Sequence, residues 1–334
     1  MAKTGKSNGL TDVGGILVGH YTDVEAVCGV TVVVCPQGAV AGVDVRGSAP
    51  GTRETDLLTP HNLIEKAQAV VLSGGSVFGL SAADGVTRWL AAKGYGFPLD
   101  REHVVPIVPG AVLYDLGRGA EFTPPINAEW GRQACADAGD DPVETGNVGA
   151  GTGAFSHSIK GGLGSASLIL DSGITVAALV AVNSDGSVIN PASGRPWEIG
   201  LEVEGEFGDR GRRAVQLPKP PPPEPIKNTT IGVIATDASL EVAQAQKVAQ
   251  MAHDGMARAI RPAHTMFDGD TVFCLATGKK ELPAKQGVFT APRALSFNEL
   301  GHAAANCMAR AIISGILKAE SLAGMTAFRD LKDL

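Results

Sequence analysis

Residues 229–278 read TTIGVIATDASLEVAQAQKVAQMAHDGMARAIRPAHTMFDGDTVFCLATG and contain two strand patterns separated by one long helix pattern. The strand patterns cover residues 229–237 and 271–278, which are apolar and rich in β-branched side chains. Residues 239–260 carry apolar side chains near helical spacing, among them Leu240, Ala243, Val248, Met251 and Met256. We therefore expect a fold that mixes helices with strands.

The sequence outside this stretch predicts further elements of both kinds. Strands are expected where short Val-rich runs are bounded by Gly or Pro, at residues 15–20, 30–36, 39–47 and 69–75. Helices are expected where apolar residues recur at helical spacing, at residues 76–94, 126–139 and about 298–319. The alternation of the two element types continues along the whole chain.

Three segments have a different character. The glycine-rich segment 145–164 predicts a flexible loop, and the apolar runs that follow it predict a hairpin that turns at residues 171–173. Residues 202–228 combine charge with a proline run and few apolar residues, which is typical of a mobile linker or surface loop. A charged, Pro-bearing loop is expected at residues 279–294.

Composition argues against several classes of protein. The chain has 334 residues, 44% of them hydrophobic, and a formal net charge of -7, which makes nucleic acid an unfavourable partner. No apolar run approaches the roughly 20 residues of a membrane span, and the first residues lack the apolar core of a signal peptide. We expect a cytoplasmic protein without a membrane partner. The five cysteines are scattered, without metal-ligand spacing, and are expected to be reduced and buried.

Two familiar site motifs fit poorly. The glycines of residues 145–164 precede a strand, whereas a dinucleotide fingerprint needs them between a strand and a helix. Asp268 and Asp270 lack the further oxygen ligands of a calcium loop, so we interpret them as part of a turn into the strand at 271–278. No metal and no cofactor are therefore expected.

Thr265 lies between the long helix and the following strand, at a junction where backbone strain can occur. If the bond between His264 and Thr265 were cut, Thr265 would carry a free α-amino group beside its hydroxyl. Such an amine titrates near about 7.7–8.0, well below lysine at about 10.4, so it can serve as the base for its own hydroxyl. The residues alone favour an ordinary threonine before a strand.

A resemblance to a known family raises the catalytic interpretation. Residues 261–278, with the strand and helix before them, resemble the self-cleaving junction of the L-aminopeptidase/D-esterase family, which includes β-aminopeptidases and nylon-oligomer hydrolases. Further similar motifs follow in the same order, namely TDVGGILVGHYTD (11–23), DVRGSAPGTRETDLL (44–58), LSGGSVFGLSAADGV (72–86), VPIVPGAVLYDL (105–116) and GAGTGA (149–154).

The resemblance implies a fold and a maturation. The fold would be α+β, a four-layer αββα sandwich that residues 1–334 form as a single domain. The precursor would cleave itself into chains 1–264 and 265–334 and assemble into a homo-oligomer, commonly a tetramer. The threonine at the junction is closer to the nylon-oligomer branch of the family.

The same resemblance assigns roles to individual residues. Thr265 matches the nucleophile, its α-amine the base, and the His264–Thr265 bond the site of self-cleavage. Asn183 matches the asparagine of the oxyanion hole, although a turn-forming asparagine is the simpler interpretation from sequence. Lys160 and Tyr114 match active-site Lys and Tyr residues; the alternatives are a solvated surface lysine and a core tyrosine.

One position departs from the family pattern. Relatives carry an acidic residue at the start of the last helix, where it contacts the amine of the nucleophile. The matching position here is Asn306, which can accept a hydrogen bond from the amine but cannot stabilise an ammonium by charge. Glu299 is a weaker candidate for that role.

The expected activity is hydrolysis of small linear amides through an acyl-enzyme on Thr265. Nylon-type 6-aminohexanoate oligomers or short peptides are the favoured substrates, and an aminopeptidase or β-aminopeptidase acting on small N-terminal residues is the alternative. Two further hypotheses are an uncleaved, inactive member that acts in binding or assembly, and an acyltransferase that passes the acyl group to an amine.

Overall fold

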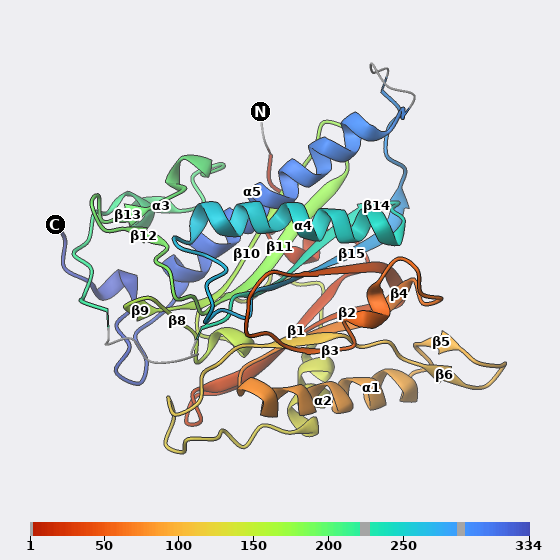
Figure 1. The fold of residues 1–334 in the computed structure, drawn as a ribbon, viewed down its shortest axis with the longest axis horizontal. Coiled ribbons are helices and arrows are strands. Elements are labelled where there is room, and N and C mark those ends of the chain that lie inside the picture. The colour runs from red at the N-terminus through yellow and green to blue at the C-terminus, as the bar shows by residue number, and fades with distance from the viewer. Residues whose placement is uncertain (1–2, 221–227, 286–290) are drawn as a thin grey trace.

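The computed structural model describes residues 3–220, 228–285 and 291–334. Figure 1 shows strands in the middle of the molecule, with one pair of helices above them and another pair below. The nine-stranded sheet has the order β10-β11-β14-β15-β2-β4-β7-β3, and β1 pairs with β2 outside this path. Because the strands pack as two layers, the sheet has an inner face between them and an outer face under each pair of helices.

One strand layer contains the elements on which the site is built. Its strands are β10 (Gly162–Ile169), β11 (Thr175–Val182), β14 (Ile231–Ala238) and β15 (Thr271–Lys280). β10 and β11 form the expected hairpin, and β14 pairs with β15 in parallel. The parallel pair requires a crossover connection, which is the long helix that the sequence predicts.

The second strand layer is built around one long strand. Its members are β1 (Leu17–Asp23), β2 (Cys28–Val45), β4 (Lys66–Ser73), β7 (Gly110–Val112) and β3 (Gly51–Arg53). β2 pairs with β1 and β4 along its first half and with β15 along its second half, with a register shift between Val34 and Ala39. The two separate strands expected at 30–36 and 39–47 are thus one continuous strand that joins the two layers.

Four helices cover the outer faces. Helices α4 (Val242–Ala259) and α5 (Ala294–Lys318) pack against each other; α5 covers β10 and β11, and α4 covers β15 and part of β2. On the opposite side, α1 (Ala82–Ala92) and α2 (Ala128–Asp137) pack together over β1, β2 and β4. The first part of the expected helix at 76–94 is a 3-10 turn, η3 (Ser76–Ser81).

Three buried apolar clusters correspond to the three interfaces of a four-layer structure. One joins α4 and α5 to the outer face of β10, β11, β14 and β15. The second lies between the two strand layers and includes Val33, Leu72, Leu179 and Phe273. The third joins β2 and β4 to α1 and α2. This arrangement confirms the expected αββα sandwich.

The remaining elements are short. They are η1 (Leu10–Asp12), η2 (Asp56–Leu58), β5 (Phe97–Pro98), β6 (Val104–Val105), η4 (Gly149–Gly151), β8 (Phe155–Ser156), β9 (Ile159–Lys160), β12 (Ile189–Asn190), β13 (Arg195–Pro196), η5 (Ile199–Leu201), α3 (Gly208–Arg212) and η6 (Phe328–Asp330). The expectation of a flexible loop at 145–164 is wrong, because residues 149–154 are buried within the fold. Their glycines allow a close backbone approach: a Cβ on Gly153 would run into the carbonyl oxygen of Val27.

Two further expectations concern surface segments. Part of the 202–228 segment is anchored in the fold, since Phe207 is buried and Glu206 pairs with Arg310 at 2.5 Å. Residues 221–227 of that segment and 286–290 of the 279–294 segment lie outside the described residues. Helix α5 is long and apolar enough for a membrane span by composition, but 83% of that stretch is buried inside the protein, as in a core helix.

Candidate active site

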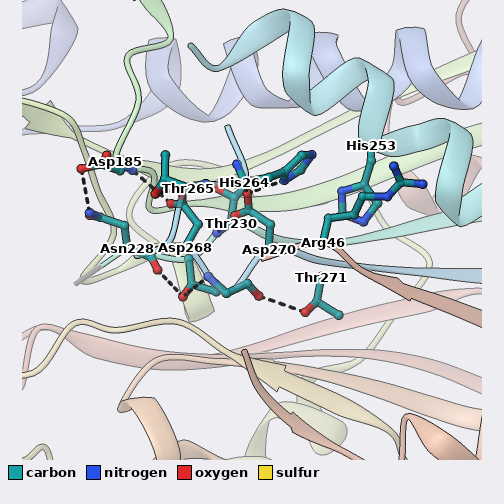
Figure 2. A network of polar contacts seen from close by, with 12 residues as sticks. Arg46, Asp185, Asn228, Thr230, His253, His264, Thr265, Asp268, Asp270 and Thr271 are labelled. Carbon is teal, nitrogen blue, oxygen red and sulfur yellow. Dashed lines mark hydrogen bonds and ion pairs between the residues drawn. The ribbon is translucent and has the colours of Figure 1, made fainter. Parts of the chain in front are cut away.

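The site lies where β11 ends and where β14 and β15 begin. Asn183 follows the last residue of β11, and its backbone carbonyl accepts a hydrogen bond of 2.6 Å from the N–H of Thr229, just before β14. The hydroxyl of Thr229 in turn accepts from the N–H of Gly269, just before β15. Residues 260–270 connect α4 to β15 and carry Thr265 into this position. Figure 2 shows Thr265, His264, Asp268 and Asp270 gathered in one group.

Thr265 is held by one carboxylate oxygen. Its backbone N–H donates to Oδ2 of Asp268 at 2.9 Å, and its hydroxyl donates to the same oxygen at 2.6 Å. The hydroxyl oxygen also accepts from the N–H of Phe267 at 3.2 Å. The hydroxyl proton therefore points at a base, which leaves lone-pair density on Oγ1 for attack on a carbonyl carbon.

The environment of Asp268 makes it a stronger base than an exposed aspartate. Its side chain is 2% exposed, and its other oxygen, Oδ1, accepts from the N–H of Asp185 at 3.3 Å. Burial, followed by the negative charge of Asp270, raises the pKa of this carboxyl group. The sequence predicts Asp268 only as part of a turn. The turn exists, since the N–H of Asp268 donates to the carbonyl of Thr265, but the side chain also accepts the hydroxyl proton of Thr265 in a hydrogen bond.

His264, on the other side of the peptide bond, is held by the second aspartate. The backbone N–H of His264 donates to Oδ2 of Asp270 at 3.1 Å, and its Nδ1 lies 2.8 Å from the same oxygen. The φ angle of His264 is +57°, in the left-handed region that residues other than glycine seldom adopt. The peptide bond between His264 and Thr265 is therefore flanked by two carboxylates, one for each residue.

Asn183 is fully buried with its carboxamide fixed in orientation. Its Oδ1 accepts from the guanidinium of Arg118 at 2.7 Å and from the N–H of Phe155 at 3.0 Å. Its Nδ2 donates to the backbone carbonyl of Tyr114 at 3.1 Å. Asn183 and Tyr114 are thus brought into contact as neighbours, through the main chain of Tyr114.

Arg118 also belongs to this candidate site, although the sequence predicts no role for it. Besides Asn183, its guanidinium donates to the carbonyl of Gly153 and lies over the ring of Phe155 with Cζ 5.8 Å from the ring centroid. Burial lowers its pKa to about 10. A lone arginine between Gly117 and Gly119 gives a weak signal in sequence, because nothing there indicates that the side chain turns toward residue 183.

Lys160 is a buried lysine, so the expected alternative of a solvated surface lysine is wrong. The side chain is 0% exposed, and Nζ donates to the carbonyls of Gly151 at 3.0 Å and Gly161 at 2.7 Å. Burial, with a smaller effect from the charge of Arg118, lowers its pKa to about 7. The glycine-rich segment thus wraps around the lysine and supplies carbonyl oxygens in place of water.

The structure does not bring Asn306 or Glu299 into hydrogen-bonding contact with Thr265 within the residues it describes. Asn306 lies on α5, where its Oδ1 accepts from Arg258 at 3.0 Å and its Nδ2 lies 3.1 Å from a ring nitrogen of His302. Glu299 forms an ion pair of 2.5 Å with Lys285. The acidic partner of the Thr265 N–H in this chain is Asp268.

Comparison with known proteins places this chain in a family. The model of peptidase family S58 matches residues 8–329. The chain belongs to peptidase family S58. The family resemblance seen in the sequence is thereby confirmed, and the protein is a peptidase-type hydrolase.

Two of the curated relatives of this S58 member illustrate different kinds of name. An uncharacterized aminopeptidase from Mycobacterium tuberculosis is 48% identical, over 97% of this chain and 98% of its own. A 6-aminohexanoate-oligomer endohydrolase from Kocuria sp. is 28% identical, over 93% of this chain and 86% of its own.

Solved structures show the same fold. The L-aminopeptidase D-Ala-esterase/amidase from Ochrobactrum anthropi, described as a variant of the Ntn hydrolase fold, superposes with a TM-score of 0.71 at 21% identity, covering 96% of this chain and 89% of its own. A β-aminopeptidase from Burkholderia sp. superposes with a TM-score of 0.70 at 24% identity, covering 98% of this chain and 92% of its own. At these identities the likeness shows the fold.

Metal binding has no support from the geometry. Over residues 3–220, 228–285 and 291–334, no group of three or more His, Cys, Asp or Glu side chains is arranged to hold a metal ion. Asp268 and Asp270 direct oxygen atoms at protein N–H and O–H donors.

Proposed function

We propose that this S58 member is a self-cleaving N-terminal threonine amidohydrolase that cuts its own His264–Thr265 bond and then hydrolyses small linear amides. The observation that carries the proposal is the double hydrogen bond from the N–H and hydroxyl of Thr265 to Oδ2 of Asp268. Asp268 is thus hydrogen-bonded both to the hydroxyl that would attack and to the Thr265 nitrogen that would become the leaving group.

Self-cleavage uses the precursor's own atoms. Asp268 takes the hydroxyl proton of Thr265 while Oγ1 attacks the carbonyl carbon of His264, which forms a tetrahedral intermediate. The proton passes to the nitrogen of Thr265 as the C–N bond breaks, which leaves His264 joined to Thr265 by an ester. Water then hydrolyses the ester, giving a carboxylate on His264 and a free α-amine on Thr265.

In turnover the new amine replaces Asp268 as the base for the hydroxyl. Oγ1 attacks the substrate carbonyl, the amine protonates the leaving nitrogen, and water hydrolyses the acyl-enzyme. We assign the carboxamide N–H of Asn183 to the oxyanion, with Lys160 and Tyr114 as further sources of positive potential or hydrogen bonds. Asp268 lies beside the new amine and supplies the negative charge that Asn306 lacks.

The names of the relatives support a proposal for the substrate class. We propose short linear amides, with two candidate groups: peptides with a free N-terminal amine and oligomers of 6-aminohexanoate. The chain is 47% to 48% identical to proteins named as uncharacterized aminopeptidases and 28% identical to an oligomer hydrolase. These identities favour the aminopeptidase substrates.

A substrate panel with nucleophile variants tests this proposal. Thr265→Val keeps the side-chain shape but removes the hydroxyl, so it should remain one chain without activity, whereas Thr265→Ser should cleave and turn over. Aminoacyl p-nitroanilides, β-dipeptides and linear 6-aminohexanoate oligomers are assayed by product mass, with and without added amino acids as acyl acceptors. Equal activity of wild type and Thr265→Val on any of these substrates would refute the role of Thr265.

The family resemblance also supports a homotetramer as a proposal. Light scattering coupled to size exclusion checks the assembly: a mass four times that of one processed protomer supports it, and a monomer mass contradicts it.

A further inference from the structure

We propose that His264 is a positioning residue for self-cleavage, held by Asp270 in a left-handed backbone conformation that presents its carbonyl carbon to Thr265. The inference rests on the proposed function and deepens it, since it concerns the acyl side of the bond that is cut. It gives the two aspartates of the sequence Asp268-Gly269-Asp270 different roles. Asp268 is the base, and Asp270 is the clamp, by which we mean the carboxylate that holds His264 in place.

The contacts of His264 show how the clamp works. Oδ2 of Asp270 receives the backbone N–H of His264 at 3.1 Å and faces its Nδ1 at 2.8 Å, so one oxygen fixes both the main chain and the ring. Asp270 is itself immobile: its side chain is 2% exposed, and Oδ1 accepts from the N–H of Thr230 at 2.8 Å. Nδ1 must carry a proton for this contact, which fixes the tautomer.

The backbone of His264 needs such a restraint. Its φ of +57° lies in a region disfavoured for a side chain with a Cβ, although histidine is among the residues that visit it more often. An isolated residue in this conformation would relax to negative φ. The hydrogen bonds from main chain and side chain to Asp270 oppose that relaxation.

A second histidine packs against the clamp. The ring of His253, on α4, meets the ring of His264 edge to face with centroids 4.9 Å apart. His253 is nearly fully buried, its Nε2 donates to the backbone carbonyl of Asp44 at 3.0 Å, and burial lowers its pKa to about 4. A neutral His253 therefore supports the ring of His264 by contact; Figure 2 shows it beside Asp270 below α4.

The two carboxylates act on opposite sides of one peptide bond. Asp268 holds the N–H and hydroxyl of Thr265, and Asp270 holds the N–H and ring of His264. Attack of a side-chain oxygen on the preceding carbonyl closes a five-membered ring, which requires the torsions of both residues to be restricted. Once the bond is cut, His264 ends the large chain, so the clamp serves maturation and not turnover.

The test measures the rate of self-cleavage in matched variants. Precursor is made by pulse-labelled cell-free synthesis, and the appearance of the 265–334 fragment is followed by mass spectrometry. His264→Leu keeps a side chain of similar bulk without a donor, while His264→Asn places an amide N–H where Nδ1 stood and tolerates positive φ. We expect His264→Leu to cleave at least about tenfold more slowly than wild type and His264→Asn to recover to within about threefold.

A double variant and the mature enzyme make the test specific. Asp270→Asn should slow cleavage, and combining it with His264→Leu should add little further loss if both act through one contact. After full maturation, kcat/KM of His264→Leu should lie within about twofold of wild type, which a general folding defect would not allow.

The outcomes separate this inference from the proposed function. Cleavage of His264→Leu at the wild-type rate, with wild type itself cleaving before Thr265, overturns the clamp and leaves the nucleophile intact. A His264→Asn variant as slow as His264→Leu also overturns it. A wild-type chain that never yields a fragment starting at Thr265 overturns the proposed function together with the clamp.

Discussion

At the scale of residues, two aspartates separated by one glycine explain the chemistry proposed for Thr265. Spacing in the sequence shows that Asp268 and Asp270 belong to a turn, and the turn is present. It does not show that both carboxylates point back toward residues 264 and 265, because that depends on the strand start at Thr271 and on the N–H of Thr230 from another strand.

Removing the base beside Thr265 should slow self-cleavage. Asp268→Asn keeps the size of the side chain but replaces the oxygen that accepts the hydroxyl proton with a group that cannot take it. We expect a loss of about a hundredfold or more in the cleavage rate, the usual size of a general-base contribution. Time-resolved mass spectrometry checks it, with Asp254→Asn on the exposed face of α4 as control. An unchanged rate in Asp268→Asn would remove Asp268 from the mechanism.

Loss of Arg118 should impair turnover through Asn183. Arg118→Met removes the hydrogen bond of 2.7 Å that orients the carboxamide oxygen while keeping an unbranched side chain. A misplaced oxyanion donor weakens the stabilisation of the transition state more than that of the ground-state complex. We therefore expect kcat to fall by about tenfold or more, with a smaller change in KM. Arg88→Met on the exposed face of α1 is the control. A change confined to KM would speak against this route.

The buried lysine should give the protein a pH-dependent stability. The pKa of Lys160 is lowered from 10.5 to about 7 in the folded chain, so between those values the unfolded chain binds more protons and stability rises with pH. The free energy of unfolding of wild type relative to Lys160→Met should therefore increase by about 2 kcal/mol from pH 7 to pH 9.

Urea unfolding in a Thr265→Val background, which should keep the chain intact, measures that difference. Lys247→Met, at an exposed position of α4, should show no such divergence from its parent. Parallel pH profiles for wild type and Lys160→Met would show that Lys160 keeps an ordinary pKa.

At the scale of elements, the sequence predicts best those elements whose periodicity is uninterrupted. The strand at 229–237, the helix at 239–260 and the hairpin that turns at residues 171–173 are found close to their expected places as β14, α4, β10 and β11. The long strand β2 was predicted as two strands, because Pro36 and Gly38 are turn residues; here they form an irregularity within one strand. The glycine-rich segment predicts a flexible loop because glycine permits many backbone conformations; its burial depends on contacts with residues far away in sequence, such as that of Gly153 with the carbonyl oxygen of Val27.

The contact between α4 and α5 depends on a glycine. A Cβ on Gly255 would run into the backbone carbonyl oxygen of Ala305. Gly255→Ala should therefore push the helices apart and destabilise the protein by about 1–3 kcal/mol, despite the better helix propensity of alanine. Thermal unfolding of the Thr265→Val chain reports the change. Gly200→Ala, where the added methyl meets nothing within 4 Å, should be nearly neutral; equal stability of both variants would contradict the packing argument.

At the scale of the whole molecule, the four layers bring together site residues from separate parts of the chain. Neither the layer order nor the pairing of β14 with β15 can be derived from periodicity, because alternating patterns do not say which strands are neighbours. The family resemblance predicts the sandwich, which is confirmed, and the roles of Thr265 and Asn183, which stay predictions. Arg118 and the two aspartates required three-dimensional structure.

The two proposed fragments should remain one particle after cleavage. The 265–334 chain would contribute β15, which lies between β14 and β2 in the sheet, and α5, which covers β10 and β11. Removing it would expose the apolar core on both faces of the sheet. Native size exclusion should thus show both fragments in one peak, and their separation without denaturant would contradict this arrangement.

The intact mass of the purified protein under denaturing conditions, with N-terminal sequencing of any smaller species, tests the central claim most directly. The account predicts two chains, the larger ending at His264 and the smaller beginning Thr265-Met266-Phe267. A single chain of 334 residues that stays unchanged on long incubation would contradict it and would favour an uncleaved binding protein.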